Sequence, residues 1–107
     1  MDDPSEQLGP FVLTEEAQRQ LETTARAHGL WRFGVRVRLV GKDTSRGFDL
    51  SFDELPERGD AILRSRGLKL FVTEDVLAQV VDPVTIDWAG RGFVFRAKRG
   101  AGGGGGR

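Results

Sequence analysis

Apolar and polar residues alternate along two neighbouring stretches of this 107-residue chain. The apolar members are Val35, Val37 and Leu39 in the first stretch and Phe48, Leu50 and Phe52 in the second. A period of two is typical of a β-strand that buries one face and exposes the other. The intervening residues 41–47 are rich in Gly, Asp, Thr and Ser, which favour turns. We therefore predict a β-hairpin with one face in a hydrophobic core.

Four further short strands are predicted after this hairpin, in two pairs. They run over residues 61–64 and 68–72, and around Val84–Trp88 and Phe93–Phe95. Glycine-containing turns separate the members of each pair, at Gly67 and at Gly90–Gly92. The polar stretch 53–60, with Pro56 and Gly59, is interpreted as a crossing loop within one domain.

Two helices are predicted from capping signals and four-residue spacing. The first follows the N-cap residue Thr14, repeats small and apolar residues at 17, 21 and 25, and stops at Gly29. The second is short, follows Thr73 and ends before Pro83. The expected order is therefore helix, hairpin, strands, short helix, hairpin.

These elements predict a mostly β, α+β fold in a single compact domain over residues 11–96. Seven Phe and two Trp supply enough aromatic area to close one core. Residues 1–10 are polar and interrupted by proline and glycine, so we expect a flexible leader. Residues 97–107 are basic and then glycine-rich, so we expect a disordered tail.

The chain has no cysteine and a single histidine, His28. The missing thiols exclude disulfides, thiolate nucleophiles, zinc–thiolate sites and ordinary iron–sulfur ligation. His28 is expected to complement the dipole at the end of the first helix, because one histidine without a titrating neighbour supports little acid–base chemistry. We therefore predict no catalytic residue, no metal site and no cofactor, and we do not expect an enzyme.

Sixteen basic and sixteen acidic residues cancel, so charge alone does not direct the chain to nucleic acid or an anionic membrane. A local basic face for an anionic partner is one interpretation of the arginines on the predicted strands. Its members would be Arg36, Arg38, Arg64 and Arg66, with Arg32 and Lys69 alongside. Cross-strand pairing with acids such as Asp49 is the alternative that the balanced charge favours. The acids of the 53–60 stretch are expected to be solvated.

No stretch approaches the roughly eighteen apolar residues that a membrane span requires, and the acidic start Met1-Asp2-Asp3 is unlike a targeting peptide. We therefore expect a cytoplasmic protein with no membrane contact. Lys98 and Arg99 beside the glycines are a weak basis for RNA binding, so nucleic acid is not an expected partner.

Five short strings, taken in order, resemble the A-type iron–sulfur cluster carriers, the HesB-like family of cluster-assembly accessory proteins. The strings are Leu13–Ala17, Gly34–Val37, Gly67–Val72, Val84–Trp88 and Gly92–Phe95. Each is common alone, and their order and spacing between Phe11 and Phe95 carry the resemblance. It implies a pseudo-barrel of short strands with an N-terminal helix and a second short helix.

The family binds its cluster through three cysteines, one in a turn after the first core strand and two in a Cys-Gly-Cys pair near the C-terminus. The corresponding stretches here are Gly41–Gly47 and Gly100–Gly104, and neither contains cysteine. Asp43 would be an isolated and weak oxygen ligand for iron. The resemblance thus implies a divergent member that lacks the three ligand cysteines.

Two functions follow as hypotheses. The first is a non-catalytic, cysteine-free homologue of the carriers that acts as an interaction or accessory module in cluster assembly. Its partner would be an iron–sulfur assembly protein or a cysteine-containing carrier relative. The second is a repurposed scaffold that binds an anionic partner through the four arginines. A homodimer is also expected to be accessible, because sheets of this kind leave strand edges exposed.

Overall fold

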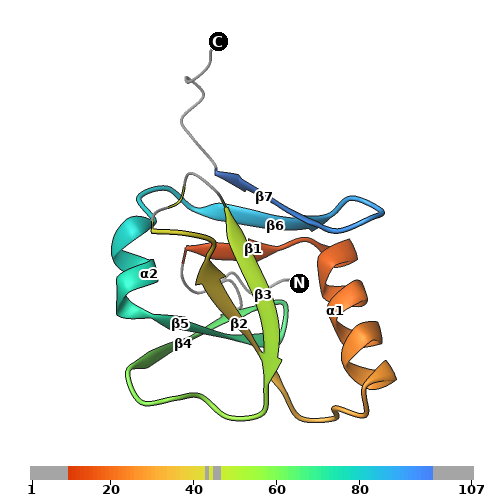
Figure 1. The fold of residues 1–107 in the computed structure, drawn as a ribbon. Helices are drawn as coiled ribbons and strands as arrows, with labels where there is room; N and C mark the ends of the chain where they lie inside the picture. The colour runs from red at the N-terminus through yellow and green to blue at the C-terminus, as the bar shows by residue number, and fades with distance from the viewer. Residues whose placement is uncertain (1–9, 43, 45–46, 98–107) are drawn as a thin grey trace.

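The computed structural model describes residues 10–42, 44 and 47–97 of the chain. These residues form an α+β fold of two sheets and two helices, which confirms the predicted fold class (Figure 1). The elements are β1 (Phe11–Leu13), α1 (Glu15–Ala27), β2 (Gly34–Leu39), β3 (Phe48–Asp53), β4 (Asp60–Ser65), β5 (Leu68–Thr73), α2 (Glu74–Gln79), β6 (Val84–Trp88) and β7 (Phe93–Ala97).

The strands form a four-stranded sheet in the order β3-β2-β5-β4 and a three-stranded sheet in the order β1-β6-β7. The two predicted hairpins, β2–β3 and β6–β7, are antiparallel pairs, and the two strands predicted on either side of Gly67, β4 and β5, also pair antiparallel. The sheets also contain two parallel pairs that the sequence did not indicate, β2 with β5 and β1 with β6. These pairs join segments distant in sequence, so no turn signal announces them.

The predicted order of elements is wrong at its start, because a strand precedes the first helix. β1 has only three residues, too few for a period of two to be recognised. Phe11 pairs with Val84 of β6, and the carbonyl oxygen of Pro10 accepts a hydrogen bond from the Val84 amide at 2.6 Å. Pro10 had been assigned to the leader, yet this bond already attaches it to the domain.

Both helices begin where the sequence predicts. The hydroxyl oxygen of Thr14 accepts a hydrogen bond from the Ala17 amide and caps α1, and Thr73 caps α2 through the Val76 amide. The apolar stripe of α1, Ala17, Leu21 and Ala25, is buried as the spacing predicts. His28 is the C-cap of α1, is exposed, and lies 2.9 Å through its Nδ1 from the carbonyl oxygen of Thr24.

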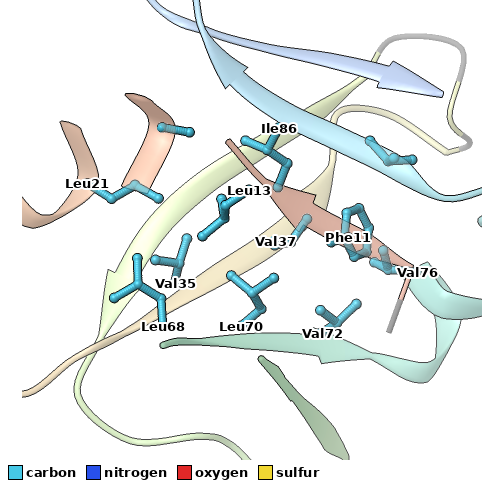
Figure 2. Packing of buried hydrophobic residues seen from close by; sticks show 12 residues of the cluster. Phe11, Leu13, Leu21, Val35, Val37, Leu68, Leu70, Val72, Val76 and Ile86 are labelled. Atoms are coloured by element: carbon cyan, nitrogen blue, oxygen red, sulfur yellow. The ribbon is translucent and has the colours of Figure 1, made fainter. Parts of the chain in front are cut away.

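The core lies between the two sheets and is closed by α1 and α2 (Figure 2). Alternate residues of β2 and β5 point into it and meet side chains from β1, β6 and both helices. The labelled members are Phe11, Leu13, Leu21, Val35, Val37, Leu68, Leu70, Val72, Val76 and Ile86. One buried hydroxyl also joins the sheets, because Ser65 of β4 accepts a hydrogen bond from the Leu13 amide at 2.9 Å.

Strand β7 continues one residue past the C-terminal boundary predicted for the domain. Ala97, assigned to the tail, is the last residue of β7 and pairs with Val84. The remaining predictions of a leader and a tail fall on residues 1–9 and 98–107, outside the described part of the chain. No helix within the described residues is long and apolar enough to cross a membrane.

Candidate functional site

The predicted basic face maps onto the outer side of the four-stranded sheet. Val35 and Val37 point into the core, so the intervening Arg36 and Arg38 lie on the opposite side. Arg36 is level with Phe71 of β5, and Arg64 of β4 is level with Lys69. The alternation therefore predicted the correct face for these side chains.

Arg36 is nevertheless buried, with only 1% of its surface exposed. Its Nε donates to Asp53 Oδ2 at 2.5 Å, and its Nη1 donates to Asp60 Oδ1 at 2.9 Å. Glu57 in the β3–β4 connection lies 4.0 Å from the same nitrogen, and the guanidinium lies 5.7 Å from the centre of the Phe71 ring. Arg36 therefore fixes the ends of β3 and β4 to the middle of the sheet.

Asp60 is the other buried member of this ion cluster, and its side chain is 1% exposed. The hydrogen bond from Arg36 holds the pKa of Asp60 below its ordinary value, and the hydrogen bond from the Glu57 amide acts in the same direction. The hydrogen bonds to Asp60 and Asp53 raise the pKa of Arg36, which stays charged. The expectation that the loop acids are all solvated is thus wrong for Asp60.

The four arginines do not form one surface for a partner. Arg36 is enclosed because the strand ends on either side bring carboxylates to it, so its assignment as a partner-binding residue is corrected. Arg38 is exposed at the far end of β2, level with Asp49. Arg64 is exposed at the opposite end of the sheet. Arg66 lies in the β4–β5 turn with a positive φ of 51°, and it is partly buried.

A second candidate site lies at the corner where the β2–β3 turn meets the end of β7 (Figure 1). It is a cavity of about 340 Å³. Its walls include Thr44 and Gly47 of the turn, Val81 and Asp82 before β6, and Phe95 and Ala97 of β7. The described residues of the 41–47 turn that line the cavity, Thr44 and Gly47, thus share it with Ala97, the last residue of β7. Residues 43, 45, 46 and 98–107 lie outside the described part of the chain.

The string Val84–Trp88 also has a structural basis. Asp87 Oδ1 accepts hydrogen bonds from the Thr14 hydroxyl at 2.7 Å and from the Trp88 amide at 2.8 Å. Arg96 of β7 pairs with the other oxygen. The Thr14 bond, followed by the Trp88 bond, lowers the pKa of Asp87. This carboxylate therefore joins the N-cap of α1 to β6 and β7, and its role is structural.

Solved structures provide the comparison with known proteins, since no protein-family model and no curated protein matches the sequence. The chain has the α+β fold of the A-type iron–sulfur carriers. An Aquifex aeolicus protein solved by NMR matches with a TM-score of 0.61 at 20% identity, over 92% of this chain and 99% of its own.

Two carriers are among the matching structures. Escherichia coli SufA, described as involved in the biosynthesis of iron–sulfur clusters, has a TM-score of 0.58 and 21% identity over 90% of this chain and 92% of SufA. IscA with a [2Fe-2S] cluster has a TM-score of 0.55 and 22% identity over 80% of this chain and 81% of IscA. These likenesses confirm the predicted fold, and neither description is that of an enzyme.

The described residues at the corner do not fit an iron–sulfur cluster. Such clusters need thiolates or, in some types, imidazoles. The chain has no cysteine, and its one histidine caps α1 and does not line the cavity. Within residues 10–42, 44 and 47–97 no three His, Cys, Asp or Glu side chains gather as a metal site would require. Asp43 lies outside the described residues.

Two features of the surface were missed from sequence. The first is the buried Arg36 cluster; its only sequence signal was the placement of Asp53 and Asp60 at the ends of the polar stretch. The second is a hollow beside Trp31 and Leu55, each 75% exposed. Two isolated apolar residues in different loops carry no periodicity, so their proximity emerges only from the fold.

Proposed function

We propose that this protein is a non-catalytic, cysteine-free homologue of the A-type carriers that serves cluster assembly as an interaction module. The observation that carries the proposal is the corner cavity, where Thr44 and Gly47 of the β2–β3 turn lie beside the end of β7 in a chain without cysteine. In a chain without cysteine ligands, the surface around this corner remains available to a partner protein. The argument from fold to pathway is one of analogy.

We further propose that the partner is an iron–sulfur assembly protein or a cysteine-containing carrier of the same fold, in the cytoplasm. Apolar exposure at the corner supports a protein contact there. Val81 is 88% exposed beside the cavity, and the half-buried Val80 and Phe95 line it. A partner that covered this corner would bury these side chains together. A second copy of the chain could occupy the same surface in the absence of the partner.

Binding to a carrier is the experiment that tests this function. The chain is mixed with each cysteine-containing carrier of its own cell, and complex formation is followed by size-exclusion chromatography with light scattering. We expect a defined complex that Val81→Asp disrupts, because a charge at the corner would be buried without a partner. Ile62→Asp is the matched control, since Ile62 is 50% exposed on the outer face of β4.

The proposal fails if no carrier or assembly protein of the cell forms a complex with the folded chain. It also fails if Val81→Asp and Ile62→Asp weaken the complex equally, because the contact would then lie away from the corner. The alternative hypothesis was an anionic partner bound by four arginines. One of the four, Arg36, is buried in an ion cluster, so we do not propose the four-arginine face as a binding site.

A further inference from the structure

An open hollow of about 580 Å³ lies at the start of β2, at the other end of the hairpin from the corner cavity. Trp31 and Arg32 border it on one side, Glu54 and Leu55 on the second, and Lys69 on the third. We name it the Trp31 hollow. Trp31 and Leu55 are both 75% exposed, which leaves two large apolar side chains in one concavity uncovered.

Cations predominate around the Trp31 hollow. Arg32 and Lys69 line it, and Arg64 lies directly across from Lys69 in the β4–β5 pairing. Like charges directly opposite one another destabilise a strand pair. No ion pair joins any of these three cations to a carboxylate within the described part of the chain. Glu54 is the one acid among the described lining residues.

The nearby acids of the outer face are already engaged. Asp53 and Asp60 both accept from Arg36, and Glu57 faces the same guanidinium. They are therefore drawn toward the buried cluster and do not neutralise Arg64 and Lys69. The Trp31 hollow therefore combines two exposed apolar side chains with a border of two cations and one acid, and a third cation, Arg64, lies beside Lys69. Trp and Arg are, with Tyr, the residue types most enriched in energetically dominant protein contacts.

We propose that the Trp31 hollow binds an acidic segment of a partner protein, with an apolar side chain of that segment seated against Trp31 and Leu55. Carboxylates flanking this anchor would pair with Arg64 and Lys69, relieve the repulsion between them, and fix the orientation of the segment. The inference does not depend on the proposed function, because the hollow and the corner cavity share no lining residue.

Charge favours an acidic protein segment over a nucleic acid. The chain as a whole has a formal net charge of zero, and the hollow carries few cations together with one acid. Tight nucleic-acid binding generally uses several phosphate contacts along a basic track. Trp31 is the one exposed aromatic residue among the described residues that line the hollow, and Leu55 beside it offers no second ring for stacking, whereas it suits an aliphatic or aromatic anchor.

The test selects peptides against the full chain from a phage-displayed random library. Particles that also bind the double variant Trp31→Ala/Lys69→Glu are removed. Trp31 is exposed and Lys69 is on a solvent-facing position, so these substitutions are compatible with folding, and far-ultraviolet circular dichroism verifies it. Affinities of the selected peptides are then measured by calorimetry for each single variant and at two salt concentrations.

We expect the selected peptides to carry Asp and Glu around a central apolar residue. Trp31→Ala, Arg64→Glu and Lys69→Glu should each weaken them roughly tenfold or more, and added salt should weaken them further. The matched controls are Val40→Ala for the loss of an exposed apolar side chain and Arg91→Glu for the charge change. Both controls lie outside the hollow and should leave affinity unchanged.

Three results would overturn the proposal. The selection could enrich nothing over the double variant, or enrich peptides without acidic residues. Oligouridylate RNA could bind the chain in a way that Trp31→Ala abolishes, which would assign the hollow to nucleic acid. The chain could form dimers that Trp31→Ala dissociates, which would assign the hollow to a second copy. None of these results bears on binding at the corner, which Val81→Asp reports separately.

Discussion

Arg36 and Arg64 occupy equivalent positions in the sequence pattern and opposite environments in the fold. Both are polar members of an alternating strand, and both lie on the outer side of the same sheet. Arg36 is on an interior strand, paired and 1% exposed, whereas Arg64 is on an edge strand, exposed, and level with another cation. The environment of each charge is therefore set by the strands beside it.

This difference distinguishes charged side chains that stabilise the fold from charged side chains that are available to bind a partner. Replacing both members of a buried ion pair with apolar residues often changes the stability of a protein little. Removing only one member is strongly destabilising, because the other charge is then buried alone. An exposed, unpaired cation contributes little to stability and remains available for binding. The outer face thus has a structural half around Arg36 and a free half around Arg64 and Lys69.

The largest expected loss of stability is that of Arg36→Met at neutral pH. Among the described residues Arg36 is the one cation that forms an ion pair with Asp60, whose side chain is 1% exposed, so the substitution leaves a buried carboxylate without a countercharge. We expect the free energy of unfolding to fall by about 3 kcal/mol or more, measured by urea denaturation. A loss below about 1 kcal/mol would show that Asp60 is solvated once Arg36 is gone.

The pH dependence of the free energy of unfolding is a second test of the Arg36–Asp60 ion pair. The pKa of Asp60 is lowered in the fold by Arg36, so its stabilising contribution is present above the unfolded value of about 3.9 and is lost as pH falls through the folded pKa. In Arg36→Met the buried, unpaired carboxyl instead has a raised pKa, so acidification favours the folded state.

The stability gap between the wild-type chain and Arg36→Met should therefore narrow as pH is lowered from neutrality to below about 4. Urea denaturation of both chains across this range measures it. The double variant Arg36→Met/Asp60→Asn is the control, and its gap to the wild-type chain should be smaller at neutral pH. A gap that stays constant with pH would contradict the assignment of the coupling to Asp60.

A smaller loss of stability is expected from Gly34→Ala, which tests the packing of the Phe71 ring beside the Arg36 ion cluster. A Cβ at residue 34 would lie 2.4 Å from Cζ of Phe71, the ring that also contacts Arg36. Overpacking of this kind costs about 1–3 kcal/mol of unfolding free energy. Gly92→Ala is the matched control, because nothing lies within 4 Å of its added Cβ. Equal stability of the two variants would contradict the close contact between Gly34 and Phe71.

The smallest change in stability is expected from a substitution in the half of the outer face around Arg64 and Lys69. Lys69→Gln removes one member of the like-charged pair with Arg64 and should change the unfolding free energy by no more than about 0.5 kcal/mol, in the stabilising direction. Thermal and urea unfolding both measure it. A clear destabilisation would show that Lys69 has a structural partner, and it would remove the basis for a free cationic rim.

Local signals predicted most of the elements and few of their long-range contacts. Thr14 and Thr73 were identified as N-caps because a capping residue acts within its own turn. Phe11–Leu13 was missed as a strand because its pairing with β6 joins segments far apart in the chain. The turn at Arg66–Gly67 was located correctly near Gly67, which adopts a positive φ of 82°.

The candidate sites were predictable to different degrees. The resemblance to the carriers singled out the 41–47 turn, and its described residues Thr44 and Gly47 line one cavity with the end of β7. Alternation gave the face of Arg36 and not its burial, because burial depends on carboxylates contributed by two other strands. The Trp31 hollow required Trp31 and Leu55 from two connections to converge with Lys69 of β5, which no local pattern encodes.

The central claim is that this chain has the carrier fold without the ability to hold a cluster. Iron and sulfide analysis after anaerobic reconstitution tests it most directly, with IscA, whose structure contains a [2Fe-2S] cluster, as the positive control. We predict that the chain retains neither iron nor sulfide after desalting and shows no charge-transfer absorbance, while IscA is loaded in parallel. Stoichiometric iron and sulfide on the isolated chain would contradict the account.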